Sequence, residues 1–274
     1  MRRRRAIFLD VDGTFADRGV VPAGHVTAVR AARAAGHLVL LCTGRPRSML
    51  PERILEAGFD GFVAAAGGYV EVAGEVLVDR RFPAALAARV VEVLDTHDVA
   101  YVLEAPDALY GPVGIDERLR SLLSGQLGGD DEQEGPVDIL RALRMSADLT
   151  GASFGKVTMF DSPVPIALLG TTLGEEVGVL PSSIPGMGDS AGELFLTGVH
   201  KAAGMAVVAE HLGVAQHDTV AFGDGLNDLE MLQYAGVGVA IEGADPRVLA
   251  VSDRTARGPG EEGLADAFAA LGLL

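Results

Sequence analysis

Short apolar runs that end abruptly in polar residues constrain the fold of this chain more than any other feature. Ala6–Leu9 stops at an aspartate, and Leu38–Cys42 stops at a Thr-Gly pair. Neither run alternates apolar with polar residues, so each is expected to be a strand buried on both faces of a parallel sheet. The Ala-rich stretch 22–35 between them predicts a helix that ends at Gly36. This alternation of strand and helix favours a parallel sheet flanked by helices.

The same signals return near the other end of the chain. Strands are predicted at 193–197, 219–222 and 237–241, and helices at 201–212 and 226–234. The middle of the chain differs. A hairpin is predicted to turn at Ala73-Gly74, followed by a helix at 84–94 and strands at 99–103 and 157–160. Residues 124–136, rich in Gly, Asp and Glu, are predicted to form a loop.

The simplest organisation is an α/β protein with two domains. A parallel-sheet core is expected from residues 1–82 and 188–274, and a second domain from the insertion 83–187.

Charge and composition narrow the classes of partner. The net charge of -16 repels nucleic acid and anionic membrane surfaces, so we expect neither as a partner. A small anionic metabolite can still bind where cationic groups gather. No apolar run approaches the roughly 18 residues of a membrane span, and Cys42 is the only cysteine. The basic start Met1–Arg5 is followed by an apolar run too short for a signal peptide, so a cytoplasmic location is expected. The sequence does not indicate an oligomeric state.

Polar residues follow three of the predicted strands. They are Asp10-Val11-Asp12-Gly13-Thr14, Thr43-Gly44-Arg45 and the run 223–228, which contains Asp224, Asn227 and Asp228; Lys201 begins a predicted helix. Ligands of open parallel sheets bind at the carboxyl ends of the strands, so these groups are expected to meet there.

The residue types favour phosphoryl transfer. Asp10, Asp224 and Asp228 offer the carboxylate oxygens that Mg²⁺ prefers, and a cation would relieve their mutual repulsion. Lys201 and Thr43 can bind an anion, and phosphoryl transfer depends on such positioning and electrostatics. An aspartate can accept the phosphoryl group as nucleophile, and a second aspartate two residues on can act as general acid and base.

The four motifs, in this order, resemble those of the haloacid dehalogenase superfamily. Residues 10–14 match its DxDGT signature, and Thr43, Lys201 and Gly223-Asp224 with Asp228 match its second, third and fourth motifs. The chain is most similar to the Cof-type phosphatases of subfamily IIB. The resemblance extends to 235–240 and 260–264, but Ala66-Gly67 stands where the family often has Asn-Gly.

The resemblance implies a fold and a set of roles. The fold is a Rossmann-like core with a cap of the C2B type inserted between motifs two and three. Asp10 would be the nucleophile and Asp12 the acid and base. Phosphate or substrate would be bound by Thr43, Gly44, Arg45, Lys201 and Asn227. Mg²⁺ would be held by Asp10, the carbonyl of Asp12, Asp224 and Asp228.

The predicted function is Mg²⁺-dependent hydrolysis of a phosphate monoester of a small metabolite, a sugar phosphate or similar compound. A phosphomutase on the same fold is an alternative, because the candidate basic residues of the cap are compatible with one: Arg80, Arg81, Arg118, Arg120, Arg141, Arg144 and Lys156. A ligand-sensing protein without catalysis is a second alternative. The presence of Asp10, Asp12, Lys201 and Asp224 counts against it.

Overall fold

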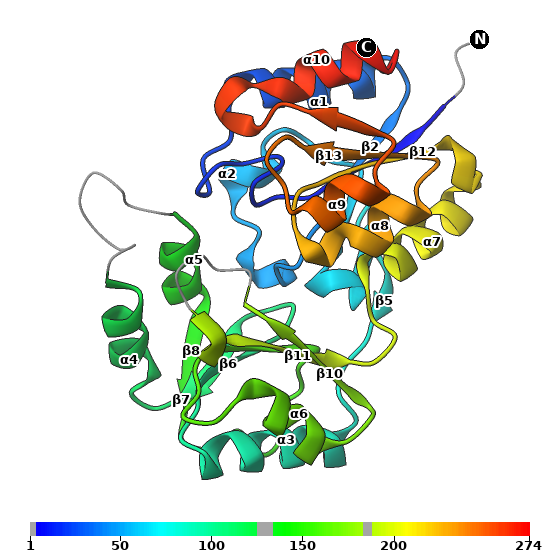
Figure 1. Ribbon diagram of the computed structural model, residues 1–274. Coiled ribbons are helices and arrows are strands. Elements are labelled where there is room, and N and C mark those ends of the chain that lie inside the picture. The colour runs from blue at the N-terminus through cyan, green and yellow to red at the C-terminus, as the bar shows by residue number, and fades with distance from the viewer. Residues whose placement is uncertain (1–3, 125–133, 183–187) are drawn as a thin grey trace. The chain divides into compact units, whose positions relative to one another are not determined.

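The computed structural model describes residues 4–124, 134–182 and 188–274 (Figure 1). The chain forms two units, each with its own sheet and its own core. The first unit comprises Met1–Arg45, Leu50–Asp79 and His200–Leu274; the second comprises Pro46–Met49 and Arg80–Val199.

An eight-stranded sheet forms the centre of the first unit, with the order β14-β13-β12-β1-β2-β3-β4-β5. The strands are β1 (Ala6–Leu9), β2 (Leu38–Cys42), β3 (Gly61–Ala64), β4 (Tyr69–Val72), β5 (Glu75–Asp79), β12 (Thr219–Gly223), β13 (Val237–Ile241) and β14 (Arg254–Ala256). Neighbours from β14 to β3 run parallel, and β4 and β5 add an antiparallel hairpin at one edge. The predicted parallel sheet and the hairpin at Ala73-Gly74 are confirmed.

Helices cover both faces of this sheet (Figure 1). On one face, Ile7 and Leu9 pack in a core with α1 (Ala23–Ala34), α2 (Glu52–Leu55) and α10 (Gly263–Ala270). On the other, Ala6 and Phe8 pack with α7 (Lys201–Leu212), α8 (Leu229–Tyr234) and α9 (Pro246–Val251). Side chains alternate between faces along a strand, so burial on both faces requires the uninterrupted apolar runs found in the sequence.

The second unit holds a six-stranded sheet with the order β10-β11-β9-β6-β7-β8. Its strands are β6 (Ala100–Glu104), β7 (Leu109–Pro112), β8 (Leu143–Ser146), β9 (Lys156–Asp161), β10 (Val177–Pro181) and β11 (Gly192–Leu196). All neighbours are antiparallel except β7 and β8. Two helices, α3 (Ala84–Thr96) and α6 (Ile166–Leu173), cover one face. The helices α4 (Ile115–Leu122) and α5 (Glu134–Ala142) pack on the other face at the β6–β8 end.

Two details differ from the sequence-based expectation. The strand expected at 193–197 is β11, and it pairs with β9 and β10 in the second sheet instead of joining the parallel one. A strand of five residues does not itself specify its sheet, because that depends on which partners the surrounding chain brings to it. The expected loop 124–136 lies mainly outside the described residues, and 134–136 form the first residues of α5.

Among the described residues, no helix is both long enough and apolar enough to cross a membrane.

Candidate active site

Three loops meet at one edge of the parallel sheet because β12, β1 and β2 are adjacent and parallel. Asp10 follows β1, and its backbone N–H donates to the carbonyl of Phe222 in β12 at 3.0 Å. Thr43 follows β2, and Asp224 follows β12. The short strands therefore deliver the sequence-predicted residues to one place.

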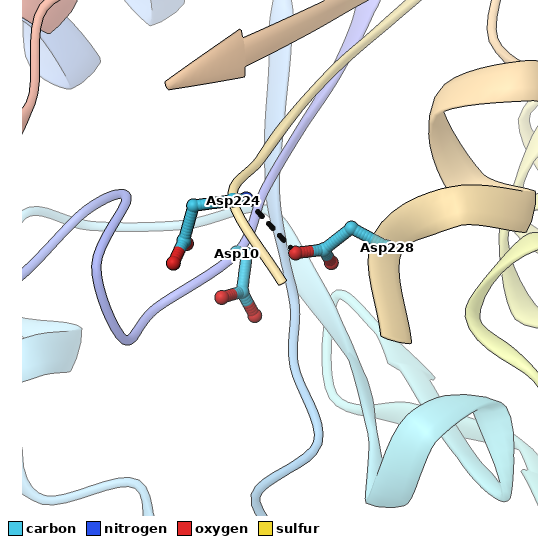
Figure 2. A group of neighbouring side chains, drawn as sticks. All are labelled: Asp10, Asp224 and Asp228. Atoms are coloured by element: carbon cyan, nitrogen blue, oxygen red, sulfur yellow. Dashed lines mark hydrogen bonds between the residues drawn. The ribbon is translucent and has the colours of Figure 1, made fainter. Parts of the chain in front are cut away.

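Lys201 joins two of the carboxylates. It is the first residue of α7 and fully buried, and its Nζ lies 2.7 Å from Oδ1 of Asp10 and 2.5 Å from Oδ1 of Asp228. The other oxygen of Asp228 accepts hydrogen bonds from the backbone N–H groups of Asp224 and Gly225, at 3.0 and 2.9 Å (Figure 2). Asp228 thus fixes the loop that carries Asp224.

A third carboxylate completes the cluster. The hydroxyl of Thr14 donates to Oδ1 of Asp224 at 2.7 Å. Gly13 lies in the loop after β1 and has a φ of +84°. A Cβ at this position would lie 2.3 Å from Oδ2 of Asp224 in the loop after β12. Only glycine allows both that backbone conformation and that approach. Figure 2 shows Asp10 and Asp224 side by side, with Asp228 farther along the segment that follows β12, just before α8.

The pKa values reflect this crowding. Burial raises the pKa of Asp10 well above its usual value; Lys201 opposes the shift, and the neighbouring carboxylates add to it. Burial raises the pKa of Asp224 to about 6, against the Thr14 hydrogen bond. Burial alone would lower the pKa of Lys201, but Asp10 and Asp228 raise it, so its ammonium stays charged. When all three carboxylates are ionised, the one ammonium leaves two negative charges that need a further cation.

The cluster fits a hard divalent cation. Its donors are all oxygens, and one ligand atom from each of Asp10, Asp224 and Asp228 lies within 4.8 Å of the others. Oxygens on opposite sides of an octahedral Mg²⁺ are separated by about 4.2 Å, given Mg–O distances of about 2.1 Å. Both oxygens of Asp228 already accept hydrogen bonds, so Asp10 and Asp224 are the better placed direct ligands, with Asp228 behind them.

The structure pairs Asp12 with Arg45. The guanidinium donates from Nε to Oδ2 at 2.8 Å and from Nη2 to Oδ1 at 2.6 Å. The Arg45 side chain is 8% exposed and that of Asp12 is 54% exposed, so a buried arginine holds a carboxylate that faces outward. The surrounding protein removes part of the water around the Asp12 carboxylate and so tends to raise its pKa, but Arg45 outweighs this effect and lowers the pKa below its usual value. The sequence predicted both residues for the site but not their pairing.

The turn after β2 is braced by a strained segment. Ala65 and Ala66 have φ of 48° and 54°, and their N–H groups donate to the carbonyls of Arg45 and Thr43 at 2.8 and 3.0 Å. Left-handed alanine costs about 1–2 kcal/mol per residue. The N–H of Arg45 donates to the Thr43 hydroxyl at 3.1 Å.

Gly44 brings this turn to the loop after β12. A Cβ on Gly44 would lie 3.4 Å from Nδ2 of Asn227, so the two loops are in contact.

The structure therefore brings the sequence-predicted residues of the first unit to one edge of its sheet. Sequence reasoning assigned no role to Thr14, although it is the last residue of the first motif, and gave no role to the backbone of Ala65 and Ala66. The local sequence carries no signal for either, since one contact joins residues 210 positions apart and the other is made by backbone atoms.

Comparison with known proteins gives matches along nearly the whole chain. Residues 7–268 match a family model described as haloacid dehalogenase-like hydrolase. The chain is 28% identical over 275 residues to YkrA of Bacillus subtilis, covering 98% of both proteins. A protein of Geobacillus kaustophilus has a similar structure, with a TM-score of 0.84, 23% identity, and coverage of 99% of this chain and 100% of that one. The subclass IIB sugar phosphatase BT4131 has a TM-score of 0.80 at 20% identity, with coverage of 98% and 100%.

Proposed function

The chain belongs to the haloacid dehalogenase-like hydrolases, and from this premise we propose that it is a phosphatase that hydrolyses a phosphate monoester of a small metabolite. The observation that carries the proposal is Lys201, whose buried ammonium is shared by Asp10 and Asp228 beside a third carboxylate. Such a site combines a carboxylate nucleophile with charge to bind both a cation and a phosphoryl group. A sugar phosphate or a similar compound is the proposed substrate class.

In the proposed first step, a carboxylate oxygen of Asp10 attacks phosphorus and the ester P–O bond breaks. The leaving oxygen takes a proton from Asp12, and the phosphoryl group stays on Asp10 as an aspartyl-phosphate. In the second step, water attacks that phosphorus and gives its proton to the Asp12 carboxylate. Inorganic phosphate leaves, and both aspartates return to their starting forms.

Arg45 affects the two steps in opposite ways. The pair with Asp12 favours the carboxylate, which is the form needed to accept a proton from water. Proton donation in the first step requires this pair to open. A phosphoryl group, which arginine binds well, is a suitable competitor for the guanidinium. We propose that Arg45 holds Asp12 before the substrate arrives and contacts the phosphate or substrate afterwards.

Four other groups are proposed to bind the phosphoryl oxygens. Lys201 supplies the positive charge of its ammonium beside Asp10. Thr43 supplies a hydroxyl, and Gly44 in the same turn supplies a backbone N–H. Asn227, in contact with Gly44, supplies an amide N–H₂ group.

Mg²⁺ is the proposed cofactor, held by Asp10, the Asp12 carbonyl and Asp224, with Asp228 assisting. When bound, it would neutralise the carboxylate cluster and stabilise charge on the phosphoryl oxygens. The all-oxygen donor set and the spacing within 4.8 Å support this proposal.

We propose that the second unit selects the ester and corresponds to the cap expected at 83–187. All residues with a proposed chemical role lie in the first unit, which recognises the phosphoryl group shared by all phosphomonoesters. Discrimination among substrates must then depend on the leaving group. No observation favours a phosphomutase or a non-catalytic sensor.

Hydrolysis of p-nitrophenyl phosphate with Mg²⁺, followed by a panel of phosphorylated metabolites, tests the proposal. Asp10→Asn should lower turnover about a thousandfold or more, because the amide cannot act as the nucleophile. The matched control is Asp98→Asn in the second unit, whose side chain is 87% exposed and should leave turnover unchanged. Normal turnover by a folded Asp10→Asn protein would contradict the mechanism.

A further inference from the structure

The first unit buries a histidine that has no part in the proposed chemistry. His25 lies in the first turn of α1 and has no exposed surface. It begins the apolar stripe of that helix, which continues through Ala28, Val29 and Ala32. An apolar side chain would suit such a position, and burial of an imidazole is costly unless its nitrogens form hydrogen bonds. The reason for a histidine here must therefore lie in the bonds that its ring makes.

The two ring nitrogens of His25 have different partners. Nδ1 lies 2.9 Å from the carbonyl oxygen of Phe15, which can only accept a hydrogen bond. Nε2 lies 3.3 Å from the backbone nitrogen of Leu264, whose N–H can only donate. Together these contacts require a neutral ring with its proton on Nδ1. Burial lowers the pKa of His25, although the Phe15 carbonyl and Glu262 oppose the shift, and this favours the neutral form.

The contact with Leu264 fixes one side of the ring to α10. Leu264 is the second residue of that helix, and the first N–H groups of a helix have no partner within it. The side chain of Glu262, which precedes the helix, does not cap it. Because α1 and α10 lie side by side in one core (Figure 1), the histidine of the first helix caps the second. His25 is thereby held by two packed helices.

The contact with Phe15 connects this fixed ring to the loop of the first motif. Phe15 is fully buried, and its N–H donates back to two carbonyls of the same loop at 3.2 and 3.0 Å. Its ring stacks on the imidazole, with the two centroids 6.1 Å apart. The preceding residue is Thr14, whose hydroxyl donates to Asp224. His25 therefore supports the residue next to the one that orients Asp224.

We propose that His25 is a positioning residue for the metal site: its Nδ1–H holds the Phe15 carbonyl and so keeps Thr14 in place to orient Asp224. Groups that orient a metal ligand from behind contribute to metal affinity, although they do not touch the metal. Without the Nδ1 bond, the buried carbonyl would lose its partner, and the loop would have to shift to find another. This inference rests on the proposed function, because it assigns Asp224 to Mg²⁺.

Two substitutions of His25 separate this role from a merely structural one. In His25→Asn, the amide nitrogen can take the place of Nδ1 and keep the bond to Phe15, whereas the bond to Leu264 is lost. In His25→Gln, the amide oxygen can take the place of Nε2 and keep the bond to Leu264, whereas the bond to Phe15 is lost. Each variant loses one buried hydrogen bond, so both should lose similar stability. The control is His37→Gln, at a buried histidine that precedes β2 and so lies at the opposite end of that strand from Thr43.

The measurements are the Kd for Mg²⁺ by titration calorimetry of the full chain and the Mg²⁺ concentration that half-saturates p-nitrophenyl phosphate hydrolysis. Loss of a group behind a metal ligand weakens metal binding about 10–100-fold, and His25 lies one step farther back, so His25→Gln should bind Mg²⁺ about tenfold more weakly. His25→Asn, which keeps the bond to Phe15, should stay within about twofold of wild type. His37→Gln should match wild type.

Equal Mg²⁺ affinity in His25→Gln and wild type would overturn the inference. Equal weakening in both His25 variants would also overturn it, because general destabilisation acts on both alike. If a variant does not fold, the imidazole nitrogen NMR spectrum of wild type decides: Mg²⁺ should shift the Nδ1 signal of His25 and not that of His37. An unchanged His25 signal would refute the connection.

Failure of the inference and failure of the proposed function are distinguishable. A wild-type protein that binds no Mg²⁺ would refute the proposed cofactor and this inference together. Normal binding and hydrolysis by wild type, with unaltered Mg²⁺ affinity in His25→Gln, would refute the inference alone.

Discussion

The two units each bury a lysine between two carboxylates, yet the two clusters are built differently. Lys201 starts a helix and meets Asp10 and Asp228 at the carboxyl ends of parallel strands. Lys156 begins β9, a central strand of the mixed second sheet, and lies between Glu104 and Glu193 on the two adjacent strands. The first cluster has an additional carboxylate, that of Asp224. Among the described residues, the second cluster has no counterpart of it.

This difference in charge suggests different tasks. One ammonium against three carboxylates leaves room for a divalent cation, whereas one against two leaves a single negative charge. The first arrangement suits a metal with a phosphoryl group, and the second is an ion cluster buried within its own sheet. Similar ingredients therefore serve different chemistry, and the number of carboxylates distinguishes the two.

The largest expected effect is on turnover when metal is removed. EDTA should reduce hydrolysis of p-nitrophenyl phosphate to background, and added Mg²⁺ should restore it, because the cation offsets the two uncompensated charges of the first cluster. The Glu193→Gln variant should show the same Mg²⁺ dependence if the second cluster holds no metal. Full activity in metal-free buffer would show that the extra negative charge of the first cluster does not need a metal cation.

Loss of either lysine should destabilise its own unit. Lys201→Met and Lys156→Met each leave buried carboxylates without a cation, a change that costs about 3–5 kcal/mol. Hydrogen exchange of amides in α7 and in β9 would report the two units separately. Mg²⁺ should restore protection in Lys201→Met alone, by about 2.7 kcal/mol at a concentration a hundred times the Kd.

Equal rescue of both variants by Mg²⁺ would mean that the second cluster also binds cations. Rescue of neither variant would mean that the first cluster does not bind Mg²⁺ once its lysine is removed.

Stability without metal should depend on pH through Asp224. Its folded pKa of about 6 lies above the usual 3.8, so the folded state binds this proton more tightly than the unfolded state does. Its contribution is then present at low pH and lost as pH rises from about 4 through 6. In EDTA, wild type should lose stability relative to Asp224→Asn over that range, and saturating Mg²⁺ should remove the loss.

Burial also raises the pKa of Glu104, so the second cluster has the same sign of pH dependence. Because we assign it no metal, Mg²⁺ should not change that dependence. Thermal denaturation at several pH values, with and without Mg²⁺, measures both. An increase in stability of wild type relative to Asp224→Asn between pH 4 and 6 would contradict the sign.

The smallest expected effect concerns backbone strain. In the second unit, Asp98 has a positive φ, and aspartate is a residue type that tolerates this conformation. In the first unit, Ala65 and Ala66 have a positive φ beside the turn that contains Thr43. Ala66→Asn should stabilise the first unit by up to about 1 kcal/mol, since asparagine adopts left-handed backbone more readily. Ala73→Asn, in the exposed hairpin with φ of 50°, is the matched control and should give a similar gain. Denaturant unfolding measures both, and a loss of stability in Ala66→Asn would show that its methyl group is required.

Prediction from sequence worked best where function imposes fixed short patterns. The parallel strands, the hairpin and the resemblance to the family were all predicted from residues close together in the chain. The second unit has no such pattern: the sequence placed 193–197 with the wrong sheet and treated Lys156 only as one basic residue among several. Glu104, Lys156 and Glu193 come from strands far apart in the chain, and nothing local joins them.

The sequence by itself determined which residues end the buried strands, because an apolar run must stop where a polar side chain is to be exposed to a ligand. It therefore determined that Asp10, Thr43 and Asp224 share one edge of a sheet. Only the tertiary structure decided the pairings: Arg45 with Asp12, Thr14 with Asp224, and Lys156 with two glutamates. Ion pairs and hydrogen bonds form within about 3 Å, whereas sequence patterns specify only the strand, the face and the end on which a side chain lies.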